Sequence, residues 1–168
     1  YNENGLPLHV GVLDVPWHNV FYDERDKEPA VPEAFACNEW DGFTVNTTLF
    51  PDFPAFLSEM KSNNNLQMIL SVHMQNGISH CDAPYFELLG SKLGRLADVT
   101  ENRTLVCNLD NETFATSFFD IVLSDPSFAD VAYWWLDYPG CSTPESSGWE
   151  NDSPETLFWS NYLFDNHH

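Results

Sequence analysis

Val131-Ala132-Tyr133-Trp134-Trp135-Leu136 is a continuous run of apolar and aromatic residues, and Asp137 follows it directly. A run this continuous does not suit a half-exposed antiparallel strand and is typical of a buried strand in a parallel sheet. Two further runs of the same kind, Leu8–Leu13 and Leu66–Val72, lie earlier in the chain. The sequence therefore predicts three buried parallel strands.

Helical patterns lie between these strands. Over Asp52–Asn63 the apolar residues have helical spacing; these residues are Phe53, Phe56, Leu57 and Met60. Asp52 is the expected N-cap of this helix, and Asn63-Asn64-Asn65 is its expected stop. A second helix is expected over Pro84–Leu93, with Tyr85, Leu88 and Leu89 on its apolar stripe.

Two more helices are expected later in the chain. One covers Thr113–Leu123, with Phe114, Phe118, Ile121 and Val122 as its apolar stripe, and Pro126 closes it. The last begins at Ser153 and Pro154, which suit an N-cap and a first-turn proline. Strands alternating with helices are typical of βαβ units, so the predicted fold class is α/β. The segments Glu24–Pro32 and Ser142–Ser153 are predicted to be exposed loops.

Length and charge restrict the class of protein. The 168 residues suit a single domain over residues 1–168 and fall short of the roughly 250 residues of a complete (β/α)8 barrel. Six Lys and Arg against 26 Asp and Glu give a net charge of −20, which disfavours nucleic acid and membrane surfaces as partners. No apolar run is long enough to predict a transmembrane helix.

Cysteines and glycosylation sequons bear on the compartment. The cysteines Cys37, Cys81, Cys107 and Cys141 form no C-x-x-C pair, and they are compatible with two disulfides in any of three pairings or with four reduced thiols. Four N-x-[ST] sequons begin at Asn46, Asn102, Asn111 and Asn151. The sequons favour a secreted protein or one in the lumen of the secretory pathway.

A polar residue follows each apolar run: Asp14, His73 and Asp137. The carboxyl ends of adjacent parallel strands face one crevice, so these three side chains are predicted to share a pocket. The alternative is that each one only caps a strand or begins a turn. Aromatic and imidazole side chains flank them at Trp17, His18, Tyr133, Trp134, Trp135 and Tyr138. Aromatic walls with carboxylates between them suit sugar rings.

Other kinds of site have weaker signals. His73, His80 and Asp82 form an H-x6-H-x-D arrangement, but its spacing matches no zinc helix motif, so no metal is predicted. The sequence contains neither a Gly-rich phosphate loop nor a G-x-S-x-G motif. No cofactor is therefore expected.

Four blocks in order resemble glycoside hydrolase family 31, which includes α-glucosidases and α-xylosidases. They are Gly11-Val12-Leu13-Asp14-Val15-Pro16-Trp17-His18, then Trp40-Asp41-Gly42-Phe43-Thr44-Val45-Asn46 with Leu49-Phe50-Pro51-Asp52, then Leu70-Ser71-Val72-His73, and finally Tyr133-Trp134-Trp135-Leu136-Asp137-Tyr138. Together they span nearly the whole chain. The resemblance implies a partial (β/α)8 TIM-type barrel of about three parallel strands with flanking helices, corresponding to the central portion of the family's catalytic barrel.

The resemblance also implies roles for individual residues. Asp137 matches the catalytic nucleophile of a retaining enzyme, and Asp14 matches an acid that hydrogen-bonds sugar hydroxyls. Trp17, His18, His73 and Trp135 would contact the sugar, an α-linked glucoside or a related one. A carboxylate flanked by aromatic residues at a strand end is also chemically suited to an oxocarbenium-like transition state.

The resemblance assigns no residue of this chain to the acid/base residue, which in the family comes from a later strand. A further departure is that Pro139 and Gly140 stand where relatives commonly carry polar residues. Hydrolysis that retains the anomeric configuration needs a second carboxyl group as the acid/base, so the chain alone is expected to be inactive on natural glycosides. Three strands also cannot close a barrel, so the rest of the barrel, a companion chain or self-assembly is expected to cover them. The alternatives are a non-catalytic structural protein, glycosylated and extracellular, and a sugar-binding module that uses Asp14 and Asp137 only for recognition.

Overall fold

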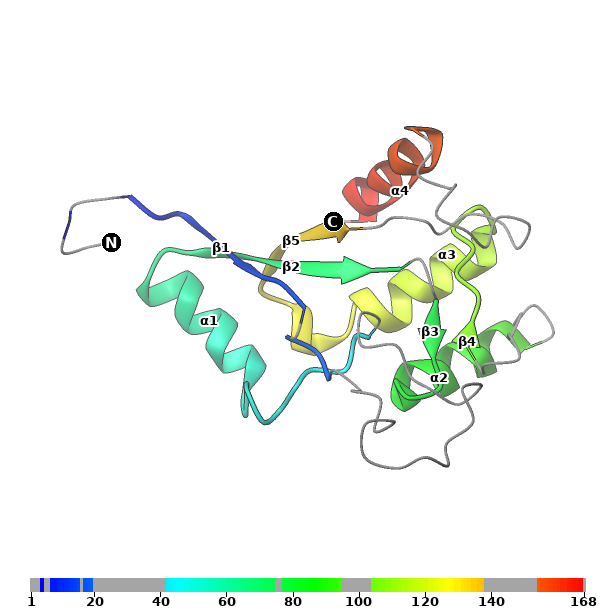
Figure 1. Ribbon diagram of the computed structural model, residues 1–168, viewed down its shortest axis with the longest axis horizontal. Coiled ribbons are helices and arrows are strands. Elements are labelled where there is room, and N and C mark those ends of the chain that lie inside the picture. Colours follow the sequence, from blue (N-terminus) through cyan, green and yellow to red (C-terminus); the bar gives the residue numbers. More distant parts are fainter. Residues whose placement is uncertain are drawn as a thin grey trace, which may run out of the picture.

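The computed structural model describes residue 4 and residues 7–15, 17–19, 42–74, 77–94, 104–137 and 154–167. At its centre lies a sheet of three parallel strands in the order β1-β2-β5 (Figure 1). The strands are β1 (Val10–Leu13), β2 (Gln67–His73) and β5 (Val131–Asp137). The three parallel strands predicted from the sequence are confirmed, and the α/β class with them. Their burial is confirmed only for the central strand β2, because β1 and β5 lie at the two edges of the sheet and each of their residues is partly or fully exposed.

Helices and short segments connect the strands. The helices are α1 (Phe53–Asn63), α2 (Ala83–Leu93), α3 (Glu112–Phe118) and α4 (Pro154–His167). A π-helical turn, η5 (Phe119–Leu123), continues α3, and a 3-10 turn, η6 (Pro126–Phe128), precedes β5. A small antiparallel ladder pairs β3 (Ile78–Ser79) with β4 (Thr104–Leu105).

Helix α1 begins and ends where its sequence predicts. The Asp52 carboxylate caps it by accepting a hydrogen bond of 3.0 Å from the backbone N–H of Ala55. At the other end Asn65 has a φ of 51°, a left-handed conformation that Asn tolerates and that stops the helix. Phe53 and Leu57 are buried against the sheet side, as the helical spacing predicts.

Two local predictions differ from the structure. Leu88 is 57% exposed, because the buried stripe of α2 is the narrow row Tyr85, Leu89 and Leu93, beside which Leu88 turns outward. The single helix expected over 113–123 changes to π-helical geometry at η5.

The β3–β4 ladder was not predicted, since each strand has only two residues. Gly77 permits it, with a φ of 80° and with Leu105 O 1.9 Å from where a Cβ would lie, too close for any side chain.

The two faces of the main sheet have different environments. Side chains alternate along a strand, so Leu70 of β2 and its ladder partners Leu13 and Trp134 lie on one face. Leu70 is fully buried there. Val12, Ile69 and Tyr133 form a row across the opposite face, and Val12 and Tyr133 are 49% and 56% exposed. We call this second side the open face of the sheet.

An aromatic cluster fills the covered face. Trp17 lies between α1 and η6, with ring centroids 6.2 Å from Phe53 and 5.6 Å from Phe128. Phe128 in turn meets Trp134 of β5 edge to face at 5.2 Å. Each large aromatic side chain buries much apolar area. The cluster is therefore a principal contact between β5, α1, η6 and the segment that follows β1.

The predicted loops Glu24–Pro32 and Ser142–Ser153 lie outside the described residues, as do Tyr138, Pro139 and Gly140. Within the described segments, the helices are too short or too polar to span a lipid bilayer.

Candidate functional site

Asp137 and His73 meet at the carboxyl ends of two neighbouring strands. They are partners in the β2–β5 ladder, and His73 Nε2 lies 3.5 Å from Asp137 Oδ2. The His73 side chain is only 5% exposed, whereas that of Asp137 is 36% exposed. Burial lowers the pKa of His73, and the negative charges of Asp137 and Asp14 oppose that lowering. The strand ends therefore bring together an accessible carboxylate and a buried imidazole.

Asp14 is near enough to these residues for its charge to act on His73. It follows Leu13, the last residue of β1 paired with β2, and it is exposed. It also begins a turn: its Oδ1 accepts a hydrogen bond of 2.8 Å from Val15 N–H, and its carbonyl accepts one of 3.3 Å from Trp17 N–H. Asp14 therefore begins a turn and also lies close enough to His73 for its charge to act on the imidazole.

Trp135 and Ser71 occupy the open face next to His73 and Asp137. They are ladder partners, two residues before the His73–Asp137 pair, so alternation places all four on one side of the sheet. Trp135 is 43% exposed, and Ser71 is fully buried. The Ser71 hydroxyl has no hydrogen-bond partner among the described residues. Ser71 is a polar member of the site that the sequence analysis did not single out, although alternation from His73 identifies its face.

Trp17 and His18 lie elsewhere. Trp17 is 1% exposed, and its indole N–H donates a 2.7 Å hydrogen bond to the backbone carbonyl of Ser71 from the covered side of β2. His18 is equally buried and contacts Trp17 edge to face. The structure therefore places both residues in the core and leaves them without access to a sugar on the open face.

Asp82 organises the second sequence block. Although it precedes α2, its carboxylate turns away from that helix and accepts hydrogen bonds from the backbone N–H groups of Phe43 (2.7 Å) and Thr44 (3.1 Å) and from the Thr44 hydroxyl. It is 1% exposed, and burial raises its pKa.

His18 lies close to Asp82, and burial lowers the pKa of His18. Its Nδ1–H donates to the carbonyl of Asn19 at 3.1 Å, and a Cβ on Gly42 would lie 2.9 Å from that nitrogen. Asp82, His18 and Gly42 thus fix the segment around Phe43 beside α2.

The weak metal arrangement does not assemble. Asp82 is occupied by its contacts with the Phe43 segment, and His80 Nε2 lies 3.7 Å from Cys81 Sγ. Among the described residues, no three His, Cys, Asp or Glu side chains are grouped so as to hold a metal ion.

Cys81 and Cys107 are disulfide-bonded, so the reduced-thiol alternative does not hold for these two. Cys37 and Cys141 lie outside the described residues, and the pairing stays a prediction.

Two of the four sequons fall within the described segments. The Asn46 side chain accepts hydrogen bonds from the backbone N–H groups of Thr48 and Leu49, at 3.1 and 3.3 Å. Asn111 is the N-cap of α3, accepting from Phe114 N–H at 3.1 Å. In both residues the carbonyl oxygen makes these contacts, and the amide nitrogen, where a glycan would attach, does not. Asn102 and Asn151 lie outside the described residues.

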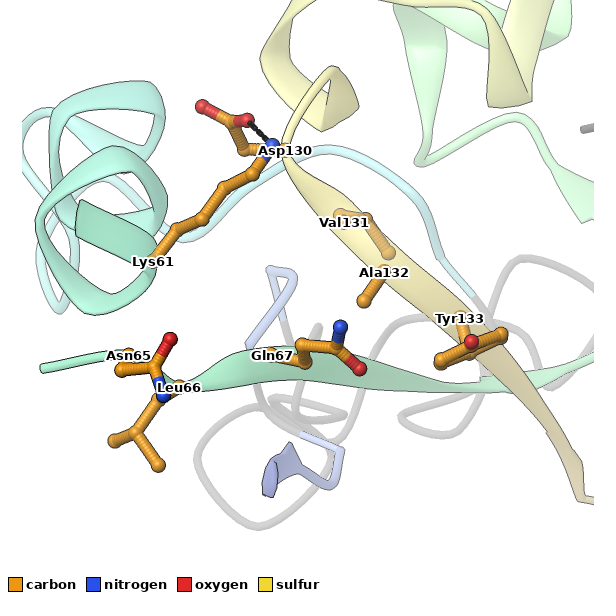
Figure 2. Close-up of a pocket in the computed structure, with 8 residues that line it drawn as sticks. All are labelled: Lys61, Asn65, Leu66, Gln67, Asp130, Val131, Ala132 and Tyr133. Carbon is orange, nitrogen blue, oxygen red and sulfur yellow. Dashed lines mark hydrogen bonds and ion pairs between the residues drawn. The ribbon is translucent and has the colours of Figure 1, made fainter. Parts of the chain in front are cut away.

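A pocket of about 420 Å³ lies at the opposite end of the sheet, where β2 and β5 begin (Figure 2). Lys61 reaches across it from α1, and its Nζ lies 2.5 Å from Asp130 Oδ1. In parallel sheets catalytic residues gather at the carboxyl ends, and the amino ends mainly serve stability. This pocket is therefore a structural junction between α1 and β5. Asp137 and His73 line neither it nor the second pocket described below.

The sequence matches the family model described as the glycosyl hydrolases family 31 TIM-barrel domain over residues 1–167. A search of curated proteins gave no match. The match spans nearly all of the chain, and the parallel β1-β2-β5 sheet with its flanking helices agrees with part of such a barrel. The chain therefore belongs to glycosyl hydrolase family 31, and its fold is a partial (β/α)8 barrel.

Proposed function

We propose that this chain is the nucleophile-bearing part of a retaining α-glycosidase barrel that acts on an α-linked glucoside or a related sugar. The observation that carries the proposal is the position of Asp137, an accessible carboxylate at the carboxyl end of β5 and 3.5 Å from His73. Exposed Trp135 on the same face supports it, because an indole ring stacks on the apolar face of a pyranose.

In the proposed reaction, an Asp137 oxygen attacks the anomeric carbon while the bond from that carbon to the leaving oxygen breaks, which yields a glycosyl ester. The leaving oxygen takes a proton from a second carboxyl group, about 5–5.5 Å from the nucleophile in retaining enzymes. Water then cleaves the ester. Asp14 hydrogen-bonds sugar hydroxyls, and buried His73 holds Asp137 in place.

The resemblance assigns no residue of this chain to that second carboxyl group, so we propose that the 168 residues alone do not hydrolyse natural α-glycosides. General acid catalysis typically contributes 10²–10⁴-fold, and an alkoxide leaving group depends on it. The rest of a barrel or a companion chain would supply the acid. The four sequons and the disulfide-bonded Cys81 and Cys107 support a secreted or lumenal location.

The first experiment uses 5-fluoro-α-D-glucosyl fluoride, because fluoride leaves without a general acid. Attack by Asp137 forms a carbon–oxygen bond as the carbon–fluorine bond breaks. We expect one fluoroglucosyl group on the peptide containing Asp137, detected by mass spectrometry. Asp137→Asn should abolish labelling, whereas Asp130→Asn, directly before the first residue of the same strand, should keep it. Labelling of another residue, or none in folded protein, would overturn the assignment.

A second candidate function is a non-catalytic protein that assembles through its sheet. It is favoured by the apolar side chains on the open face, since Val12, Tyr133 and Trp135 are all more than 40% exposed. Light scattering distinguishes the candidates. A defined oligomer that forms without sugar and takes up no label at Asp137 would support assembly and exclude catalysis.

A further inference from the structure

A second pocket, of about 510 Å³, lies between α3 and α4. Ala115, Thr116 and Phe119 line it from the α3 side, and Trp159, Leu163 and Asn166 line it from α4. The α4 positions are three, four and seven residues apart, and Phe119 lies four residues after Ala115 and three after Thr116, so each helix presents one continuous face to the space. No residue of the β1-β2-β5 sheet lines it. We call it the α3–α4 groove.

Contacts at both sides hold the groove in shape. The Trp159 indole N–H donates a 3.1 Å hydrogen bond to the backbone carbonyl of Leu109, which closes one end. On the same helix, Phe164 meets Phe119 edge to face with ring centroids 5.2 Å apart. Trp159 also stacks on Tyr162, with ring centroids 5.6 Å apart. The indole is therefore fixed in position and still 41% exposed.

The lining combines an apolar floor with a polar rim. Leu109, Ala115 and Phe119 are buried and form the apolar part. Asp110, Glu112, Thr116 and Asn166 are exposed polar side chains at the groove. Among the residues that the structure describes, no Lys, Arg or His lines the groove, so phosphate and carboxylate ligands would meet the negative charges of Asp110 and Glu112 there.

These features select a class of ligand. A volume of a few hundred cubic ångströms suits a small molecule. The apolar floor and the fixed indole suit the C–H face of a pyranose. The rim contains acceptors in Asp110 and Glu112 and groups that both donate and accept in Thr116 and Asn166, which matches hydroxyls that do both. An organic cation would use the acceptors alone.

We propose that the α3–α4 groove is a carbohydrate-binding site for a neutral oligosaccharide, distinct from the strand ends. The choice of an α-linked glucose oligomer as its ligand rests on the proposed function. The groove holds the sugar by stacking on Trp159 and by hydrogen bonds to the rim. It would keep an oligosaccharide on the protein independently of Asp137.

The test titrates maltotriose into the full, unglycosylated chain by isothermal calorimetry. Thr116→Arg fills the groove from an exposed position and should weaken binding at least about tenfold, whereas Thr113→Arg, exposed on the same helix outside the lining, should not. Trp159→Ala should weaken binding by a similar factor. Its control is Phe158→Ala, which removes a 76% exposed ring that does not line the groove. Circular dichroism checks folding of each variant.

Asp137→Asn separates the two proposals. Maltotriose binding that survives Asp137→Asn and is lost in Thr116→Arg supports the groove, even where labelling of Asp137 fails. Binding lost in Asp137→Asn but kept in Thr116→Arg places the sugar at the strand ends, which overturns the groove and leaves the proposed function standing. Absence of maltotriose binding also overturns the proposal that the groove binds carbohydrate. Tighter binding of benzyltrimethylammonium, used as a probe for organic cations, than of maltotriose would overturn it as well.

Discussion

His73 Nε2 lies 3.5 Å from Asp137 Oδ2, and the two residues are direct partners in the parallel β2–β5 ladder. The backbone pairing thus fixes a buried imidazole against a partly exposed carboxylate, at the end of the sheet where parallel folds place their chemistry. Removing the imidazole tests whether it positions the carboxylate.

We expect His73→Gln to slow labelling of Asp137 by 5-fluoro-α-D-glucosyl fluoride about tenfold or more, because the variant loses the buried imidazole 3.5 Å from the carboxylate and a misplaced nucleophile reacts more slowly. The pH profile separates positioning from a general loss of structure. Burial lowers the pKa of His73, so the ring stays neutral at pH 7 and gains its proton only on acidification below pH 6.5. The wild-type labelling rate should show this titration, and His73→Gln should lack it. An unchanged profile in the variant would contradict the role.

Asp82 is expected to contribute more to stability than a typical surface carboxylate. In Asp82→Ala the buried N–H group of Phe43 and the partly buried N–H group of Thr44 lose their acceptor, and an unsatisfied buried donor costs about 1–3 kcal/mol. We therefore predict a loss of roughly 3 kcal/mol in the free energy of unfolding, measured by urea titration. Asp52→Ala is the matched control: it removes the exposed N-cap of α1 and should cost about 1 kcal/mol. Equal losses in the two variants would show that the Asp82 contacts are weak.

His18 should make the fold sensitive to mild acid. Burial lowers its pKa, so below pH 6.5 the unfolded chain takes up a proton that the folded chain still excludes, and stability falls as the pH drops from 6.5 to the lowered pKa. Asp82 acts in the opposite direction, because its raised pKa makes the folded chain retain a proton as the pH rises above 3.8.

His18→Asn keeps a donor for the Asn19 carbonyl and removes the titration. Urea unfolding at pH 7.5 and 5.5 should therefore give a smaller difference in this variant than in the wild type. A difference of the same size would exclude His18 as a source of the acid sensitivity.

The strands and α1 could be predicted because their signals are local: continuous apolar runs, the Asp52 cap and the Asn stop. The same local signals identify the residues that follow each strand, and alternation places His73, Trp135 and Asp137 on one face. The contacts of Asp82 could not be predicted in this way. They join it to Phe43 and Thr44, 39 and 38 residues earlier, and no spacing rule links them.

Trp17 shows why nearness in sequence to a candidate site residue is a poor guide. It follows Asp14 by three residues, and the resemblance to family 31 implies that both contact the sugar. The turn closed by the Asp14 carbonyl and Trp17 N–H instead directs the indole to the covered side of the sheet. There it donates to the Ser71 carbonyl and packs on Phe128.

Trp17 and Trp135 are therefore expected to respond in opposite ways to substitution. Trp17→Ala should lower the free energy of unfolding by about 3–5 kcal/mol, because it opens a cavity in a packed aromatic core. Trp135→Ala removes a 43% exposed ring from the open face, and we predict a change within about 1 kcal/mol but a clear loss of labelling at Asp137. Urea titration and the fluoride assay measure the two effects. A stable Trp17→Ala variant with impaired labelling would instead place the Trp17 indole at the sugar.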